Sequence, residues 1–224
     1  LNTSNFFLVE KSALLKLFYI NELGENDLNY NFIENRILEN GNFENFNLSY
    51  SSFFSKNEII SNLNENYGSV FINGAILAQN NQHHEIKTKI NHIGQTTKSY
   101  QKIKSVIAKN SKSVFQGKIF VDKNAQKTDG YQLSKAILLD ENAEFDSKPE
   151  LEIYADDVKC SHGSSSGNLD ENSIFYLMTR GINKEEAKKI LIKGFLNDSV
   201  ETITNNEIKK FLFEKLDKKL NEYR

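Results

Sequence analysis

The feature that most restricts the fold is a long succession of short segments that read as β-strands. Up to about Gly163, runs rich in β-branched and aromatic residues, such as residues 69–72, 87–90 and 118–121, are separated by Asn, Gly, Asp and Ser. Regular short strands with turn signals are typical of a sandwich, a barrel or a solenoid, and the periodicity alone does not choose among these three. A helix-period stripe competes with this pattern only from Ser12 to Phe18.

The pattern changes after Gly167, where three helix-period segments follow one another. Asp170 can cap the first helix and Gly181 can end it, Asn183 opens the second with a capping box, and the third begins near Asn205. The apolar faces predicted for these helices are Ile174, Leu177 and Met178; Ala187, Ile190, Leu191 and Phe195; and Ile208, Phe211, Leu212, Leu216 and Leu220. We therefore expect a β core over residues 1–166 and a helical subdomain over residues 167–224.

Composition excludes several classes of partner. The 28 Lys and Arg residues nearly balance the 30 Asp and Glu residues, so there is no basic footprint for nucleic acid. Apolar runs are too short to span a bilayer, and we expect no membrane contact. The single Cys rules out a disulfide within the chain, which suits a reducing compartment.

The segment from residue 149 to residue 163 holds the only Pro, the only Cys and a His two residues beyond that Cys. Leu151, Ile153 and Ala155 alternate with polar positions, as in a half-buried strand. If this strand continues, Cys160 and His162 point to the same face, because side chains at i and i+2 do so. A thiolate beside an imidazole can hold iron, or sulfur on its way to iron. The competing interpretation is a small buried Cys beside a His that bonds a turn.

Other polar residues give weaker signals. Asp156 and Asp157 would point to opposite faces of a regular strand, so they do not form a catalytic carboxylate pair. His83 and His84 also face opposite ways, and His92 lies further along the chain. No Cys and His spacing here matches a structural zinc site, and hydrogen-bonded or surface positions are favoured for these histidines over metal binding.

Four blocks in fixed order resemble the SufB/SufD family of iron–sulfur cluster assembly proteins. They are Val-Phe-Gln-Gly-Lys-Ile at 114–119, Ala-Gln-Lys-Thr-Asp at 125–129, the segment at 149–163 and the segment at 172–182. The variant Lys-Cys-Ser-His-Gly at 159–163 is similar to the SufD branch, and His83 and His92 stand where the family tends to carry histidines. The likeness is dense from about His83 to Phe195.

The chain also departs from the family pattern. Gly130 stands where the family usually has Ala, and Ser164, Ser165 and Ser166 replace a more typical Ala-Thr-Val. Family members are usually longer, with an additional N-terminal region, whereas this chain begins at Leu1. Both a piece of a longer protein and a naturally short form remain open.

The resemblance implies a mostly β fold, a right-handed parallel β-helix with a small C-terminal helical subdomain. It implies a non-enzymatic scaffold subunit that pairs with a SufB-like subunit, or with itself as a homodimer. Its tail, with Ile190, Leu191 and Phe195, would bind a SufC-like ABC ATPase. Cys160 and His162 would handle a transient iron–sulfur cluster or iron at the subunit interface, with the other ligands from the partner and none held stably by the isolated chain. The expected location is cytoplasmic, in a bacterial cytosol or a plastid stroma.

Two alternatives remain beside this interpretation. The first is a SufB-type subunit of the same system, which the Lys-Cys-Ser-His-Gly variant disfavours. The second is a β-solenoid carbohydrate-active enzyme that uses Asp156 or Asp157. Such enzymes are typically secreted, and the absence of a secretion signal, the strand-borne Cys and the helical tail argue against this alternative.

Overall fold

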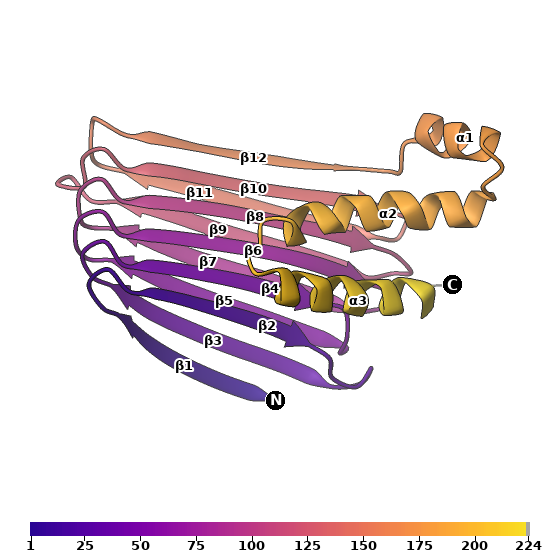
Figure 1. Cartoon of the computed structure of the whole chain (residues 1–224), viewed down its shortest axis with the longest axis horizontal. Coiled ribbons are helices and arrows are strands. Elements are labelled where there is room, and N and C mark those ends of the chain that lie inside the picture. Colours follow the sequence, from indigo (N-terminus) through magenta and orange to yellow (C-terminus); the bar gives the residue numbers. More distant parts are fainter. Residues whose placement is uncertain (223–224) are drawn as a thin grey trace.

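The computed structural model describes residues 1–222 and consists of two parallel sheets followed by three helices (Figure 1). Sheet A contains β1 (Asn2–Val9), β3 (Leu28–Ile37), β5 (Phe54–Leu63), β7 (His83–His92), β9 (Lys112–Val121) and β11 (Glu144–Ile153). Sheet B contains β2 (Leu14–Asn21), β4 (Asn42–Ser49), β6 (Ser69–Ala78), β8 (Lys98–Ile107), β10 (Asp129–Leu138) and β12 (Lys159–Gly167).

The strands alternate between the two sheets, so each pair of consecutive strands makes one coil of a parallel β-solenoid. Up to the last coil, each strand pairs in parallel with the equivalent strand of the next coil, as β3 does through Tyr30 and Lys56 and β9 through Lys112 and Glu144. A mostly β solenoid followed by helices is the predicted fold class, which is confirmed.

The helix considered from Ser12 to Phe18 is wrong. Leu14–Asn21 is strand β2, in register with β4. Leu15 and Leu17 turn inward against the solenoid core, while Lys16 and Phe18 turn outward. The backbone hydrogen bonds to β4 and the packing on both faces stabilise the strand. An apolar pattern with helical spacing over only seven residues is a weak signal for a helix.

The corners after β1, β3, β5, β7 and β9 of sheet A are built in the same way from coil to coil. One residue there has a left-handed backbone and donates its N–H to a carbonyl of the next coil. These residues are Ser12, Asn40, Tyr67, Thr96 and Lys127, with φ between 57° and 64°. A positive φ is uncommon outside Gly and Asn, so the repeated bond between coils holds an otherwise costly conformation.

The interior between the sheets is apolar with polar rows running through it. Ile and Phe side chains from successive coils stack, including Ile33, Ile59, Ile86 and Phe115. Beside them, amide and hydroxyl side chains bond from coil to coil, for example Asn29 to Ser55 at 3.1 Å. These hydrogen bonds between coils satisfy polar side chains that are buried in the narrow interior and cannot reach water.

Three helices follow β12, namely α1 (Glu171–Thr179), α2 (Lys184–Val200) and α3 (Asn206–Glu222). Asp170 and Asn183 cap α1 and α2 with their side chains, and Gly181 ends the first helical segment with φ at +88°. The three predicted helices and their start and stop residues are therefore confirmed.

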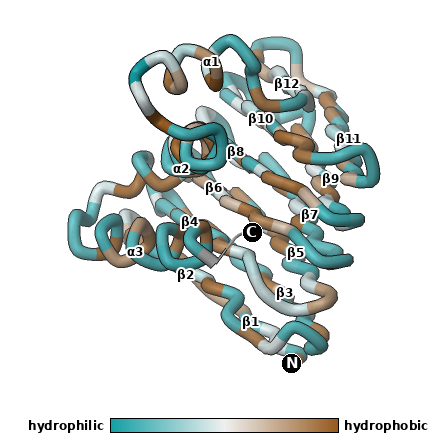
Figure 2. The backbone as a smooth tube through the Cα atoms, turned by 90° about the vertical axis from the view of Figure 1, so that its right-hand side faces the viewer, coloured by the Kyte–Doolittle hydropathy of each residue, from teal (hydrophilic) through white to brown (hydrophobic). Residues whose placement is uncertain are grey.

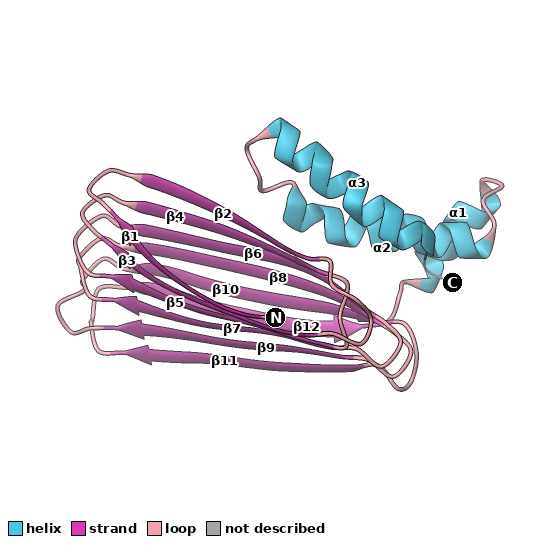
Figure 3. Ribbon diagram, turned by 90° about the horizontal axis from the view of Figure 1, so that it is seen from below, coloured by secondary structure: helices cyan, strands magenta, loops and turns pink. Residues whose placement is uncertain are grey.

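Helices α2 and α3 cover part of the outer face of sheet B, and α1 extends beyond it (Figures 2 and 3). Ile192, Leu196 and Val200 of α2 pack with Leu212 and Leu216 of α3 over the outward side chains of sheet B. Lys102 and Lys104 of β8 both bind the carboxylate of Asp198. The helices and the sheet share this core. The predicted boundary between residues 166 and 167, which divides the chain into a β core and a helical subdomain, therefore stays a prediction.

The buried face of α2 differs from the predicted one. Ala187 is buried as expected, but the other buried apolar positions are Ile192, Leu196 and Val200, whereas Ile190 is 40% exposed. Apolar residues lie on more than one side of this helix, and the sheet selects the side that it covers. Sequence periodicity could not make that choice, because it carries no information on what lies beneath the helix.

Candidate functional site

Cys160 and His162 lie on β12, the last strand of sheet B, and not on the strand that carries Leu151 and Ile153. Strand β11 ends at Ile153, and a corner containing buried Ala155 leads to β12. The continuous strand assumed from the sequence is therefore wrong. Ala155 and Val158 of this corner pack with Ile119 and Val121 of β9, so the alternation of apolar residues continues past the end of the strand.

The same-face placement of the two side chains nevertheless holds within β12. Cys160 pairs with Gly130 and His162 with Gln132 of β10. Gln132 is buried in the interior, so its register partner His162 and the neighbouring Cys160 face the interior side of the last coil. No further strand of the described chain covers this end, so both residues lie at its open end.

The Cys160 thiol is half-buried in a small apolar cluster. Ile119 and Val121 from β9 and Ala125 and Ala155 from the adjacent corners form this cluster. Burial raises the pKa of the Cys160 thiol above its usual value, the backbone of Gly130 opposes the shift by a hydrogen bond, and the negative charge of Asp129 adds a smaller increase. At neutral pH the thiol of the free chain is therefore protonated, and thiolate chemistry needs a change of surroundings.

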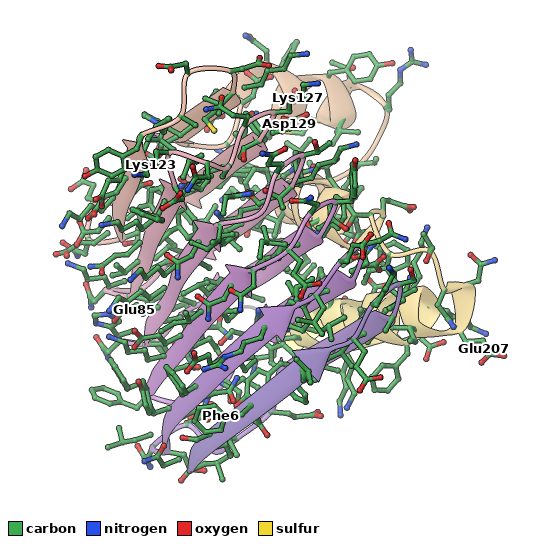
Figure 4. All side chains as sticks on the ribbon, turned by 90° about the vertical axis from the view of Figure 1, so that its left-hand side faces the viewer. Phe6, Glu85, Lys123, Lys127, Asp129 and Glu207 are labelled. Carbon is green, nitrogen blue, oxygen red and sulfur yellow. The ribbon has the colours of Figure 1, made fainter. Side chains whose placement is uncertain are left out.

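His162 is exposed, in contrast to Cys160. The remaining carboxylates nearby lie at the corner: Asp156 and Asp157 are exposed, and the Asp157 backbone carbonyl accepts the N–H of Lys127 at 2.6 Å. Figure 4 looks onto these corners, with Lys123, Lys127 and Asp129 together at the top and Phe6 at the opposite end of the solenoid. The structure thus brings Cys160 and His162 together and leaves the two aspartates in a structural turn.

The histidines of β7 occupy different environments. His84 and His92 are buried in the interior, where His84 bonds Ser49 at 3.0 Å and His92 bonds Thr97 at 2.7 Å and Ser99 at 2.9 Å. His83 faces outward against Phe54. Within residues 1–222 no three His, Cys, Asp or Glu side chains gather as metal ligands would. The hydrogen bonds of His84 and His92 agree with the interpretation favoured from the sequence.

The two buried histidines should make stability depend on pH. Burial lowers the pKa of His84 to about 4 and of His92 to about 3, whereas an unfolded histidine titrates near pH ~6.5. Below that pH the unfolded chain binds protons that the folded chain does not, so stability is lost as the pH falls, by up to about 1.4 kcal/mol per pH unit for each histidine. Urea titrations between about pH 7 and pH 5 should show this loss, and His92→Gln should flatten it. An unchanged slope in that variant would contradict the neutral state of His92.

The tail residues predicted to bind the ATPase divide between two surfaces. Ile190 and Leu191 line a shallow groove between α1 and α2 together with Tyr176 and Leu177. Phe195 lies on another side of α2, where it packs with the shared core beneath the ammonium of Lys104, 4.5 Å from its ring centre.

Sequence periodicity missed the most exposed apolar residues of the tail. Phe175 is 68% exposed and Tyr176 57% exposed on α1, and Met178 lies beside them in the sequence. The signal was present, because residues 174–178 are five consecutive apolar residues and a helix can bury only some of them on one side. Exposed apolar residues that lie close together are common on surfaces that bind another molecule.

Comparison with known proteins agrees with the motifs at the site. Residues 2–195 match the family model described as the SUF system FeS cluster assembly, SufBD core domain. The chain is 31% identical over 216 residues to the iron–sulfur cluster assembly protein SufD of Escherichia coli, covering 96% of this chain and 51% of that protein. It is 32% identical over 145 residues to SufD of Bacillus subtilis, covering 65% of this chain and 33% of the relative.

A plant relative extends the comparison. The chloroplastic protein ABCI7 of Arabidopsis thaliana is 41% identical over 112 residues, which cover 50% of this chain and 24% of that protein. The chain spans about half the length, or less, of these curated relatives. None of the helices described here is long and apolar enough to cross a membrane. With a family model matched over most of its length and the Cys160 and His162 motif on the last coil, the chain belongs to the SufBD core family of SUF-system iron–sulfur cluster assembly proteins, and it is SufD-like.

Proposed function

We propose that this chain is a scaffold subunit that takes part in iron–sulfur cluster assembly only together with a partner chain. The observation that carries the proposal is the placement of Cys160 and His162 on the interior side of the last, uncovered coil. Most iron–sulfur clusters need several thiolate ligands, and this chain offers one thiol. Iron or a nascent cluster, as cargo, would therefore take its remaining ligands from another subunit.

The open end of the solenoid suits a second chain of similar structure. β11 and β12 are the edge strands of their sheets, and the described chain pairs only one side of each. Interior residues of β11, including Phe145 and Leu151, are only partly buried there. Unpaired edges beside uncovered apolar residues favour strand addition by a partner. We propose a SufB-like subunit as this partner, with a homodimer of this chain as the other outcome.

The proposed partner of the tail is a SufC-like ABC ATPase. The groove of Tyr176, Leu177, Ile190 and Leu191, with exposed Phe175 beside it, is the apolar surface that would receive it. Phe195 would act differently, by holding α2 on sheet B. ATP hydrolysis would belong to the ATPase, and the subunit itself would be non-enzymatic and reside in a bacterial cytosol or a plastid stroma.

Two substitutions should separate this docking surface from the rest of the tail. Tyr176→Asp or Ile190→Asp should reduce co-purification of the ATPase by about tenfold or more, because interfaces concentrate their energy in a few apolar anchors. Phe211→Asp is the matched control, since Phe211 is 47% exposed on α3, outside the groove. Retained binding in the groove variants, or equal loss in the control, would place the ATPase elsewhere.

Affinity isolation from the native cell tests the proposal as a whole. A SufB-like chain and an ABC ATPase should be recovered with this protein in defined proportions. Recovery of the protein with neither chain, under conditions that preserve complexes, would refute the scaffold function.

A further inference from the structure

We propose that Gly130 is a positioning residue, which sets where the Cys160 sulfur rests by leaving a niche in the wall of the last coil. The two residues are register partners on β10 and β12, and both face the interior. That the thiol acts in cluster assembly rests on the proposed function. The position of the sulfur atom can be tested whether or not the thiol has that role.

The niche is defined by what a side chain at residue 130 would touch. A Cβ atom on Gly130 would lie 3.3 Å from Cys160 Sγ, 3.3 Å from Ile119 Cδ1 and 3.5 Å from Ser99 Oγ. The first two distances are shorter than ordinary contacts between carbon and its neighbours. The sulfur therefore leans toward the preceding coil, over the bare backbone of Gly130, and contacts the apolar cluster that includes Ile119.

The far wall of the niche is held in place. Ser99 is buried, and its hydroxyl bonds His92 Nε2 at 2.9 Å, while His92 Nδ1 bonds the Thr97 hydroxyl at 2.7 Å. Ile119 is fully buried. Ser99 and Ile119 cannot move aside easily. A side chain added at residue 130 would therefore displace the Cys160 sulfur toward the open end of the solenoid.

Gly130 thus keeps the thiol retracted in the free chain. The conformation that presents the sulfur at the open end must then be favoured by something else, such as a docked partner. An Ala at this position would hold the sulfur slightly further out, and a Val would fill the niche.

The single Cys makes a direct test available, because a thiol reagent labels only residue 160. The rate of alkylation by iodoacetamide should be measured on the free chain, without iron, sulfide or partners. We expect it to rise by about twofold in Gly130→Ala and by roughly tenfold in Gly130→Val, because reaction requires an accessible sulfur. Circular dichroism should show that both variants keep the β signal, and the labelling rate in denaturant gives the unfolded limit.

Gly167→Ala and Gly167→Val are the matched controls. Gly167 lies on the same strand as Cys160, and an added Cβ there meets no atom within 4 Å. Rates in these controls should equal that of the wild-type chain. Unchanged labelling in folded Gly130→Ala and Gly130→Val, or an equal rise in the Gly167 variants, would overturn the inference. If Gly130→Val does not fold, Gly130→Ala decides the outcome alone. Neither result bears on cluster assembly, so failure here and failure of the proposed function can be told apart.

Discussion

Replacing Gly94 with Ala is expected to lower the free energy of unfolding by about 3 kcal/mol or more, a large share of the stability of an ordinary domain. Gly94 lies in the corner after β7, where its N–H donates to the carbonyl of Leu63 at 2.9 Å. A Cβ at this position would lie 2.1 Å from the carbonyl oxygen of Glu65 and 2.8 Å from the backbone nitrogen of Asn66. Backbone atoms of the neighbouring coil cannot move aside as a flexible side chain could. The corner would have to open.

Gly194 provides the matched control for this substitution. It lies inside α2, and a Cβ added there meets nothing within 4 Å. Gly194→Ala should stabilise the protein by about 0.5–1 kcal/mol, because Ala loses less backbone entropy in a helix. Urea denaturation of both variants would measure the two effects with opposite signs. A Gly94→Ala chain as stable as the wild type would mean that the corners are not stacked as closely as described.

Much of the fold follows from local signals in the sequence. Turn residues at regular spacing predict a succession of short strands, and Asp170, Asn183 and Gly181 predict where helices begin and end, because caps act on the adjacent backbone. The choice of a solenoid over a sandwich or a barrel needed the resemblance. Strand pairing across about thirty residues leaves no mark in a short window of sequence.

The sequence predicted the residues of the site, but it did not predict most of the residues that surround them. Spacing alone placed Cys160 and His162 on one face, and the structure does the same on β12. The corner before β12 escaped prediction because Ala155 is buried like a strand residue. The niche at Gly130 was not predicted either, because Ile119 and Ser99 come next to Gly130 only through the stacking of the coils.

The second large effect concerns cluster assembly. Cys160→Ser removes the thiol and His162→Ala removes the imidazole, and each should reduce the iron and sulfide retained after reconstitution by about tenfold or more, as loss of a metal-site residue commonly does. Neither change removes a large apolar contact, since His162 is exposed and Ser is close in size to Cys. The subunits should therefore still assemble.

Ser166→Ala is the control for these two variants. Ser166 pairs with Ala136 on the same face of β12, is exposed, and carries no metal-ligating group. This variant should behave as the wild-type chain in both assembly and reconstitution.

The most direct test of the central claim is the iron and sulfide content of the complex with the proposed SufB-like subunit and ATPase, measured after anaerobic reconstitution for each variant. We predict a cluster in the wild-type and Ser166→Ala complexes, little iron in the isolated chain, and little cluster in intact complexes carrying Cys160→Ser or His162→Ala. Wild-type cluster content in both of the latter complexes would contradict a shared assembly site at the open end of the solenoid.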